Sequence, residues 1–212
     1  KRLLECPTFH LSQEYRKPDK TGIEYWDTVF GFLSGDKGDM FIELGVFKGT
    51  TATIIGNKMS EEGFAQKLHA FDCFDGLPEN WRSLEAGTFS VDDMPNVPEN
   101  VELIDGLFKD TLPVFASENK GKKINLLHMD ADLYSSTYES FRDLHHMFRS
   151  GTIVAFDEFA FWPNFHKGKQ SEFEALIDAS RDFGFDYEYV MRGWDDEDSK
   201  KIRCGEIASI LK

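Results

Sequence analysis

The stretch Met40-Phe41-Ile42-Glu43-Leu44-Gly45-Val46-Phe47-Lys48-Gly49 decides the fold of this 212-residue chain. Residues 40–44 form a short apolar run that is typical of a buried strand, and the two glycines mark a tight turn. Residues 50–59 suit a helix. A strand, a glycine turn and a helix in this order predict an α/β fold.

The rest of the chain repeats this alternation. Further strands are expected over residues 68–71, 101–104, 124–129, 152–156, 185–191 and 202–210. Ser136 and Glu139 have the spacing of a capping box for a helix that Gly151 would end, and another helix is expected over 170–183. We therefore predict a mostly parallel sheet of seven strands with helices on both faces, in which the last two strands form an antiparallel hairpin.

The chain is acidic, with 38 Asp and Glu against 24 Lys and Arg and a formal net charge of −14. Nucleic-acid binding depends mainly on clustered Lys and Arg, so we expect no nucleic-acid partner. The apolar runs are shorter than the ~20 residues of a membrane-spanning helix, and residues 1–10 lack an apolar signal core, so neither a membrane nor export is expected. Three cysteines without CxxC spacing, Cys6, Cys73 and Cys204, favour a reducing, cytoplasmic location.

One domain is expected over residues 39–212, because the alternating pattern begins there. Residues 1–38 precede the pattern and include the aromatic side chains of Tyr25, Trp26 and Phe30. We expect this N-terminal segment to be helical. It could pack on the core, cover the site as a lid, or contact a second copy in a homo-oligomer.

Five successive expected strands end in an acid. These acids are Glu43, Asp72, Asp105, Asp130 and Asp157. One acid at a strand end is ordinary turn chemistry, but ligands of α/β sheets bind at the carboxyl ends of the strands. Five in succession therefore predict one acidic binding site.

The glycine turn lacks the pattern of a nucleotide-phosphate site. The G-x-G-x-x-G and P-loop patterns are both missing, and Glu43 would repel a pyrophosphate. S-adenosylmethionine fits better, because it carries no phosphate, has a cationic sulfonium and an ammonium group, and has a ribose diol that a carboxylate can bind. Gly45 and Gly49 would let the backbone approach this ligand, and Asp72 would hold the ribose. A plain strand-to-helix turn is the alternative.

A second acidic cluster contains Asp130 and Asp132, followed after the next expected strand by Asp157 and Glu158. Neighbouring strand ends lie about 5 Å apart, so Asp130 and Asp157 can converge on one cation. Oxygen ligands suit Mg²⁺ or Ca²⁺. The alternative is that these acids cap loops and helices, and Asp132 could serve either purpose.

Five motifs carry a family resemblance. They are Glu43-Leu44-Gly45-Val46-Phe47-Lys48-Gly49, Phe71-Asp72-Cys73-Phe74-Asp75-Gly76-Leu77-Pro78, Gly106-Leu107-Phe108-Lys109-Asp110-Thr111-Leu112-Pro113, Asp130-Ala131-Asp132-Leu133-Tyr134-Ser135-Ser136-Thr137 and Phe156-Asp157-Glu158. Together and in this order they resemble the macrocin and mycinamicin sugar O-methyltransferases, over about residues 39–160. The second and fourth motifs are more specific than the glycine turn.

The resemblance implies a class I methyltransferase fold, which is Rossmann-like, with S-adenosylmethionine as the donor and Mg²⁺ holding an acceptor with neighbouring oxygens. By position, the donor-binding residues would be Glu43, Gly45 and Asp72, with Asp105 as a further candidate near the adenine. Gly49 of the glycine turn and Asp130 complete the expected donor-binding set. The metal ligands would be Asp130, Asp157 and Glu158. Glu158 departs from the family pattern, which usually has two aspartates, or an acid and an amide, at this pair.

Methyl transfer needs a hydroxyl that is deprotonated or polarised and aimed at the sulfonium. A metal chelated by two vicinal oxygens of the acceptor would lower the acceptor's pKa and orient it. Catechol-type methyltransferases have a lysine shortly after the first metal aspartate, but here Leu133 and Tyr134 follow. The catalytic candidates are therefore His128, His166 or a metal-site acid such as Asp130, although a lone strand histidine is more often a hydrogen-bonded core residue.

Two aromatic loops are candidates for acceptor specificity. Residues 80–100 contain Trp81, Phe89 and Met94 together with Gly and Pro, which predicts a mobile lid. Residues 159–163 follow the metal pair directly and would wall the acceptor pocket. Either loop could instead simply pack against the core.

The expected function is that of a metal-dependent O-methyltransferase acting on a small hydroxylated molecule. Two other functions stay open at this point. Asp130-Ala131-Asp132 is a D-x-D pattern, with which many glycosyltransferases hold a metal and a nucleotide sugar, although the chain has little basic character near it. The second is a non-catalytic ligand-binding module on the same fold.

Overall fold

The computed structural model describes residues 8–10, 23–33, 39–157, 171–194 and 206–210. Within these residues one sheet has the strand order β1-β7-β8-β6-β5-β2-β3-β4. Its strands are β1 (Thr8–His10), β2 (Met40–Leu44), β3 (Leu68–Asp72), β4 (Val101–Asp105), β5 (Ile124–Met129), β6 (Ile153–Phe156), β7 (Tyr187–Trp194) and β8 (Glu206–Ile210). The sheet has eight strands where seven were expected, because the short strand β1 pairs in parallel with β7 and forms an edge.

The central strands β6, β5, β2, β3 and β4 are parallel to one another. This arrangement confirms the α/β alternation that the glycine turn predicts. Strand β8 is antiparallel to both of its neighbours, β6 and β7. The connection between β7 and β8 lies outside the described residues.

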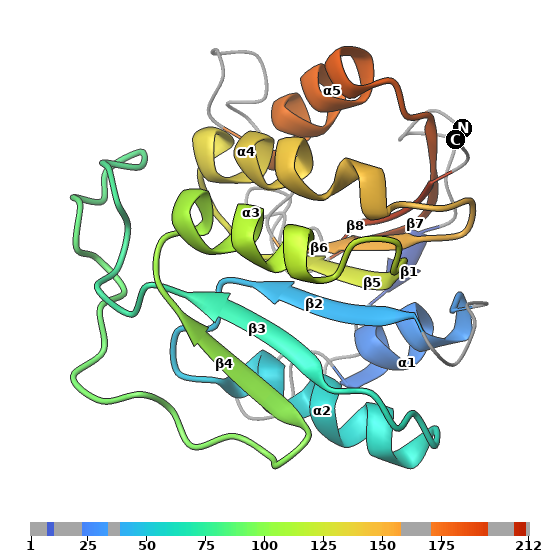
Figure 1. Cartoon of the computed structure of the whole chain (residues 1–212), viewed down its shortest axis with the longest axis horizontal. Coiled ribbons are helices and arrows are strands. Elements are labelled where there is room, and N and C mark those ends of the chain that lie inside the picture. The colour runs from blue at the N-terminus through green and yellow to red at the C-terminus, as the bar shows by residue number, and fades with distance from the viewer. Residues whose placement is uncertain (1–7, 11–22, 34–38, 158–170, 195–205, 211–212) are drawn as a thin grey trace.

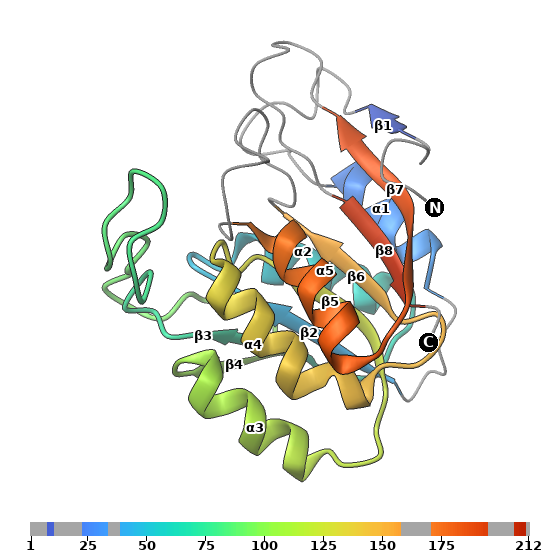
Figure 2. The same ribbon diagram turned by 90° about the horizontal axis from the view of Figure 1, so that it is seen from above.

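Five α-helices cover the two faces of the sheet in the part of the chain that the structure describes. They are α1 (Ile23–Gly31), α2 (Thr50–Glu61), α3 (Phe108–Glu118), α4 (Tyr134–Leu144) and α5 (Glu172–Phe183), and the 3-10 helix η2 (His145–Met147) follows α4. Helices α3, α4 and α5 lie on one face, and α1 and α2 lie on the other (Figures 1 and 2). Each of these described helices is too short or too polar to cross a lipid bilayer.

Alternation along the strands gives each face its own core. In β2, Ile42 and Leu44 pack into the core beneath α3, α4 and α5. Phe41 faces the opposite side and packs with Phe30 and Trp26 of α1. Helix α1 thus belongs to the core on its side of the sheet.

Helix α4 begins three residues earlier than the capping-box pattern indicates. Leu133 is its N-cap residue and has extended backbone angles, and Asp132 before it has a left-handed φ of 58°. The chain therefore turns at Asp132, and Ser136 lies inside the first turn, where its carbonyl accepts a hydrogen bond from Ser140. The prediction that Ser136 caps this helix was wrong.

The capping box that the structure does contain is at the start of α5. The backbone N–H of Glu174 donates to the Ser171 hydroxyl, and the Glu174 carboxylate accepts from the backbone N–H of Ser171. Gly184 ends the helix in a left-handed conformation with φ of 71°. Helix α5 therefore has both of its ends fixed by local sequence.

The segment between β3 and β4, residues 73–100, projects beyond the carboxyl ends of the parallel strands (Figures 1 and 2). Backbone hydrogen bonds hold it in place. Leu77 donates to the Thr88 carbonyl, Gly87 donates to the Leu77 carbonyl, and Val91 donates to the Phe74 carbonyl. This loop forms an outer wall beside the strand ends, and its mobility stays a prediction.

Candidate active site

A cavity of about 390 Å³ opens at the carboxyl ends of the parallel strands. Its walls come from the turns after β2, β3, β4, β5 and β6 and from the 73–100 loop. The lining residues are Gly45, Val46, Phe47, Asp72, Cys73, Gly76, Leu77, Pro78, Trp81, Phe89, Gly106, Leu107, Phe108, Asp130, Ala131, Asp132, Ser136 and Asp157. The structure therefore brings together Gly45, Asp72, Asp130 and Asp157 of the predicted site.

Gly45 lies where the ends of β2 and β5 come close together. Its φ is +96°, and a Cβ atom at this position would lie 1.9 Å from the backbone oxygen of Asp130. The backbone N–H of Asp130 donates to the Leu44 carbonyl at 2.9 Å. Glycine is therefore needed to keep the two strand ends hydrogen-bonded at the cavity wall.

Asp72 ties the glycine turn to the end of β3. One carboxylate oxygen accepts from the backbone N–H groups of Val46 and Phe47, each at 2.8 Å. The other accepts from the N–H of Phe74 at 2.8 Å. Asp72 also lines the cavity, so the residue that shapes the turn forms part of the cavity wall.

Gly49 and Asp105 do not line the cavity. Gly49 is the N-cap of α2 with φ of 75°, and a Cβ there would lie 2.9 Å from a side-chain atom of Pro95 in the outer loop. Asp105 is exposed, because β4 is the last strand of the sheet. The residues after it, including Gly106 and Phe108, line the cavity instead.

Glu43 and His128 are buried on the α1 side of the sheet and are not among the residues that line the cavity. They are register partners on β2 and β5, and Glu43 Oε1 lies 3.1 Å from His128 Nδ1. Trp26 packs edge-on against the His128 ring. Burial raises the pKa of Glu43 above its ordinary value, although the contact with His128 opposes this shift.

Asp130 and Asp157 converge as the acidic strand ends predict. Oxygen atoms of these two carboxylates and a ring nitrogen of His128 all lie within 4.8 Å of one another. Burial, and then the charges of Asp157 and Asp132, raise the pKa of Asp130 well above its ordinary value. A divalent cation would remove this repulsion, so the donor set fits a metal. Glu158, the other predicted ligand, lies outside the described residues, as do residues 159–163 and His166.

Several site residues were not predicted. Glu172 of α5 is buried, and its Oε1 accepts from the Ala131 N–H at 3.0 Å, which fixes the turn after Asp130. Phe108 and Ser136 line the cavity from α3 and α4. Glu172 is 41 residues from Ala131, so no local sequence pattern could connect the two.

The rim of the cavity is aromatic and has unusual backbone angles. Phe47 and Phe89 line the cavity in edge-to-face contact, with ring centroids 5.6 Å apart, and are 37% and 42% exposed. Both have positive φ, as do Phe74 beside Asp72 and Arg82 beside Trp81. Residues other than glycine rarely adopt this conformation, and they cluster at functional sites when they do.

Solved structures share this arrangement of strands and helices. The calicheamicin methyltransferase CalS11 matches with a TM-score of 0.67 at 18% identity, over 92% of this chain and 80% of that one. Apo CalS11, described as a TDP-rhamnose 3'-O-methyltransferase, matches with a TM-score of 0.61 at 18% identity, over 92% and 81%. The O-methyltransferase NovP matches with a TM-score of 0.60 at 20% identity, over 90% and 79%. These likenesses show a class I, Rossmann-like methyltransferase fold.

The sequence itself was also compared with known proteins and families. A search of curated protein sequences found no match. The family described as a methyltransferase domain matches residues 42–159, which span the strands from β2 to β6 and most of the cavity wall. The chain therefore belongs to the methyltransferase-domain family.

Proposed function

We propose that this protein transfers a methyl group from S-adenosylmethionine to a hydroxyl of a small molecule, with a divalent metal such as Mg²⁺ at Asp130 and Asp157. The observation that carries the proposal is the convergence of these two carboxylates, beside the glycine turn, on one cavity. The acceptor would be a sugar of a natural product or another molecule with vicinal oxygens.

The charge of the cavity favours this donor. Asp72, Asp130, Asp132 and Asp157 line it, and none of the described lining residues is Lys, Arg or His. A cationic sulfonium and an ammonium group are attracted to such a site, whereas a pyrophosphate is repelled. The same argument disfavours a nucleotide-sugar-dependent glycosyltransferase built on the D-x-D pattern.

Separate groups of residues would hold the donor and the metal. The Gly45 turn and Asp72 would position the donor, with the apolar side chains of Leu107 and Phe108 beside its adenine. Asp130 and Asp157, with Glu158 as the further ligand that the resemblance implies, would hold the metal. A bound divalent cation supplies a Lewis acid that lowers the pKa of a coordinated hydroxyl.

The resemblance to macrocin and mycinamicin O-methyltransferases supports the sugar acceptor, as does CalS11, which is described as a TDP-rhamnose 3'-O-methyltransferase. The aromatic rim of Phe47, Phe89 and Trp81 suits an acceptor with an apolar face. A glycosylated natural product has both an oxygen-rich sugar and such a face.

Calorimetry with S-adenosylhomocysteine, followed by methylation assays on a panel of sugar and catechol acceptors with and without Mg²⁺ or Mn²⁺, tests the proposal. We expect donor binding, and methylation that chelation abolishes. Asp157→Asn should abolish methylation. Asp105→Asn should leave methylation unchanged, because Asp105 is exposed and lies outside the cavity. The absence of donor binding would refute the proposal, and donor binding without turnover on any acceptor would favour a non-catalytic module.

A further inference from the structure

Glu43 and His128 form a buried acid–histidine pair next to the cavity. Their side chains are 0% and 1% exposed, and Nδ1 of the histidine lies 3.1 Å from Oε1 of the glutamate. Trp26 of α1 covers the ring, with centroids 4.8 Å apart. Apolar side chains of similar volume often stabilise a core as well as a buried ionic pair does, so stability alone does not explain these two residues.

The pair has the arrangement of a metal-binding histidine and its supporting carboxylate. Histidine ligands of metals usually donate their other ring N–H to a carboxylate, a backbone carbonyl or a water molecule, which fixes the tautomer and the ring orientation. Glu43 occupies Nδ1 and leaves Nε2 for a ligand. Among the described residues, His128 makes no hydrogen bond other than that to Glu43.

The remaining ligands are close by. His128 lies on β5, and Asp130 directly follows the end of that strand. A ring nitrogen of His128 and one oxygen each of Asp130 and Asp157 lie within 4.8 Å of one another. Two ligands with bonds of about 2.1 Å to one ion can lie about 4.2 Å apart, so small side-chain rotations bring all three into the first coordination shell of a cation.

We propose that His128 is a ligand of the divalent cation through Nε2, beside Asp130 and Asp157, and that Glu43 is a positioning residue for its ring. This inference rests on the proposed function, since it concerns the metal of that reaction. Mg²⁺ prefers oxygen ligands alone, whereas imidazole suits transition metals. The site therefore prefers Mn²⁺, Fe²⁺ or Co²⁺ over Mg²⁺.

Pulsed electron paramagnetic resonance of the full chain with bound Mn²⁺ tests the assignment, because it detects a nitrogen nucleus bound to the metal without requiring turnover. We expect nitrogen coupling in the wild type that changes frequency when the protein carries ¹⁵N-histidine. His128→Gln should lose the coupling. Glu43→Gln should keep it but weaken Mn²⁺ binding by about 10–100-fold.

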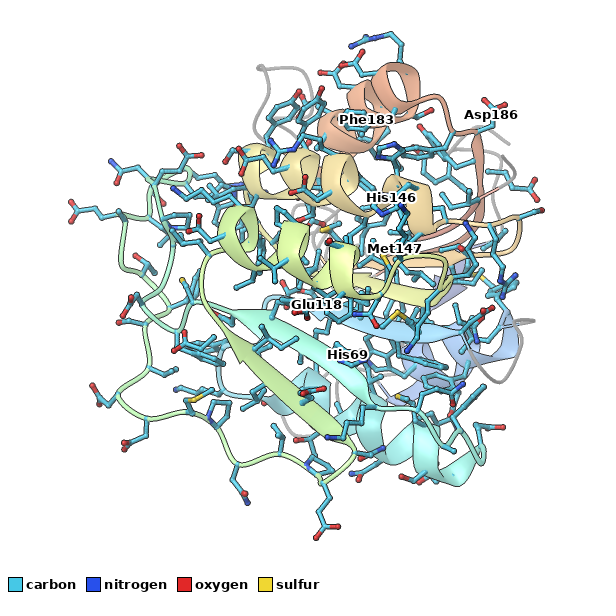
Figure 3. The ribbon with its side chains drawn as sticks, in the orientation of Figure 1. His69, Glu118, His146, Met147, Phe183 and Asp186 are labelled. Carbon is cyan, nitrogen blue, oxygen red and sulfur yellow. The ribbon has the colours of Figure 1, made fainter. Side chains whose placement is uncertain are left out.

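His69 offers a matched control. It also lies on a strand, and its Nδ1 is 3.1 Å from a carboxylate oxygen of Glu102 on the neighbouring strand. It faces the other side of the sheet, beneath α3, where it contacts Phe115 (Figure 3). His69→Gln should therefore leave both the nitrogen coupling and Mn²⁺ binding unchanged.

The outcomes separate this inference from the proposed function. Mn²⁺ that binds without histidine coupling refutes the ligand assignment and leaves a metal-dependent methyltransferase intact. The absence of metal binding, with S-adenosylhomocysteine still bound, refutes both the assignment and the metal dependence. Calorimetry should show Mn²⁺ binding on the order of tenfold tighter than Mg²⁺, and equal affinities would contradict the inferred preference. If His128→Gln does not fold, the isotope comparison in the wild type still decides the assignment.

Discussion

At the scale of single residues, Gly45 shows how closely the strand ends approach each other at the cavity. Gly45→Ala would place a Cβ atom 1.9 Å from the Asp130 backbone oxygen, so β2 and β5 must separate or the protein must unfold. We expect a loss of roughly 3–5 kcal/mol in the free energy of unfolding. Denaturant unfolding of the purified variant measures it.

Gly63→Ala is the control for this prediction. Gly63 also has positive φ, at +76°, but no atom lies near the site of its missing Cβ. Gly63→Ala should therefore lose only about 1–2 kcal/mol of unfolding free energy, which is the cost of a left-handed backbone for alanine. Equal losses in the two variants would mean that the contact with Asp130 is not the cause.

The ionised carboxylate of Asp130, by contrast, lowers the stability of the folded protein. Its folded-state pKa is raised, so the stability contributed by its protonated form is present below about pH 4 and is lost as the pH rises through the raised pKa. Asp130→Asn mimics the neutral form. Without metal, we expect the variant to be more stable than the wild type at pH 8, on the order of 1 kcal/mol, with a difference that shrinks toward pH 5.

Urea unfolding at several pH values in the presence of a chelator checks this expectation. The exposed strand-end acid Asp105 provides the comparison, and Asp105→Asn should show no such pH-dependent gain. A metal-free Asp130→Asn protein that is less stable than the wild type across the whole range would contradict the explanation.

At the scale of elements, α5 carries the capping box that determines where the helix starts. Ser171→Ala removes the hydroxyl that accepts from the Glu174 N–H, and we expect a loss of about 1 kcal/mol in unfolding free energy. Ser136→Ala in α4 is the matched control, because Ser136 does not cap its helix. Thermal unfolding of both variants is the measurement, and equal destabilisation would contradict the difference between the two serines.

The loop of residues 73–100 is the second element with a testable role. Phe89→Ala removes one ring of the edge-to-face pair at the cavity rim. We expect the KM for a methylated acceptor to rise roughly tenfold while S-adenosylhomocysteine binding is unchanged. Met94→Ala is the control, since Met94 lies in the same loop, is 51% exposed and does not line the cavity. An equal effect of both changes would assign the loss to the loop as a whole.

The central strands could be predicted from the sequence to within a residue. Residues 40–44 and 124–129 are strands as expected, because short apolar runs between turn residues are read directly. The start of α4 could not be predicted, since it depends on the left-handed backbone of Asp132, and Ser136 offers a misleading local signal. Helix α3 contains Pro113, a residue that argues against a helix interior, and it has no counterpart among the expected elements.

The position of the site in the fold could be predicted, but not which of the acidic residues line it. Strand ends place Asp72, Asp130 and Asp157 at one cavity, as the sequence suggests. Glu43 lies one residue before the end of β2, where it faces into the α1 side of the sheet and meets His128. Asp105 ends an edge strand. The placement of Glu43 depends on the face of the sheet that it occupies, and that of Asp105 on the position of its strand in the sheet. Neither can be inferred before the strand order is known.

At the scale of the whole molecule, a bound divalent cation would reduce the repulsion among the excess acidic side chains. We expect Mn²⁺ at about 100 times its dissociation constant to stabilise the fold by about 2.7 kcal/mol, through mass action. Differential scanning calorimetry should show the melting temperature rising with Mn²⁺ and falling back when a chelator is added.

Screening of exposed charges is the competing explanation for such a rise. Sodium chloride at the same ionic strength screens the surface but does not bind between Asp130 and Asp157. It should therefore raise the melting temperature much less than Mn²⁺ does. Equal shifts with the two salts would mean that general screening is responsible.

Helix α1 has a consequence for how this protein can be recombined with others. The family match begins at residue 42, after α1, yet Trp26 of α1 covers His128, and the Tyr25 hydroxyl donates to the Phe156 carbonyl next to Asp157. A chimera that exchanges only the matched segment would leave behind the helix that packs on the acid–histidine pair. The smallest segment of this enzyme that can be transplanted therefore includes α1. Boundaries drawn from sequence similarity alone would separate α1 from the strands on which it packs.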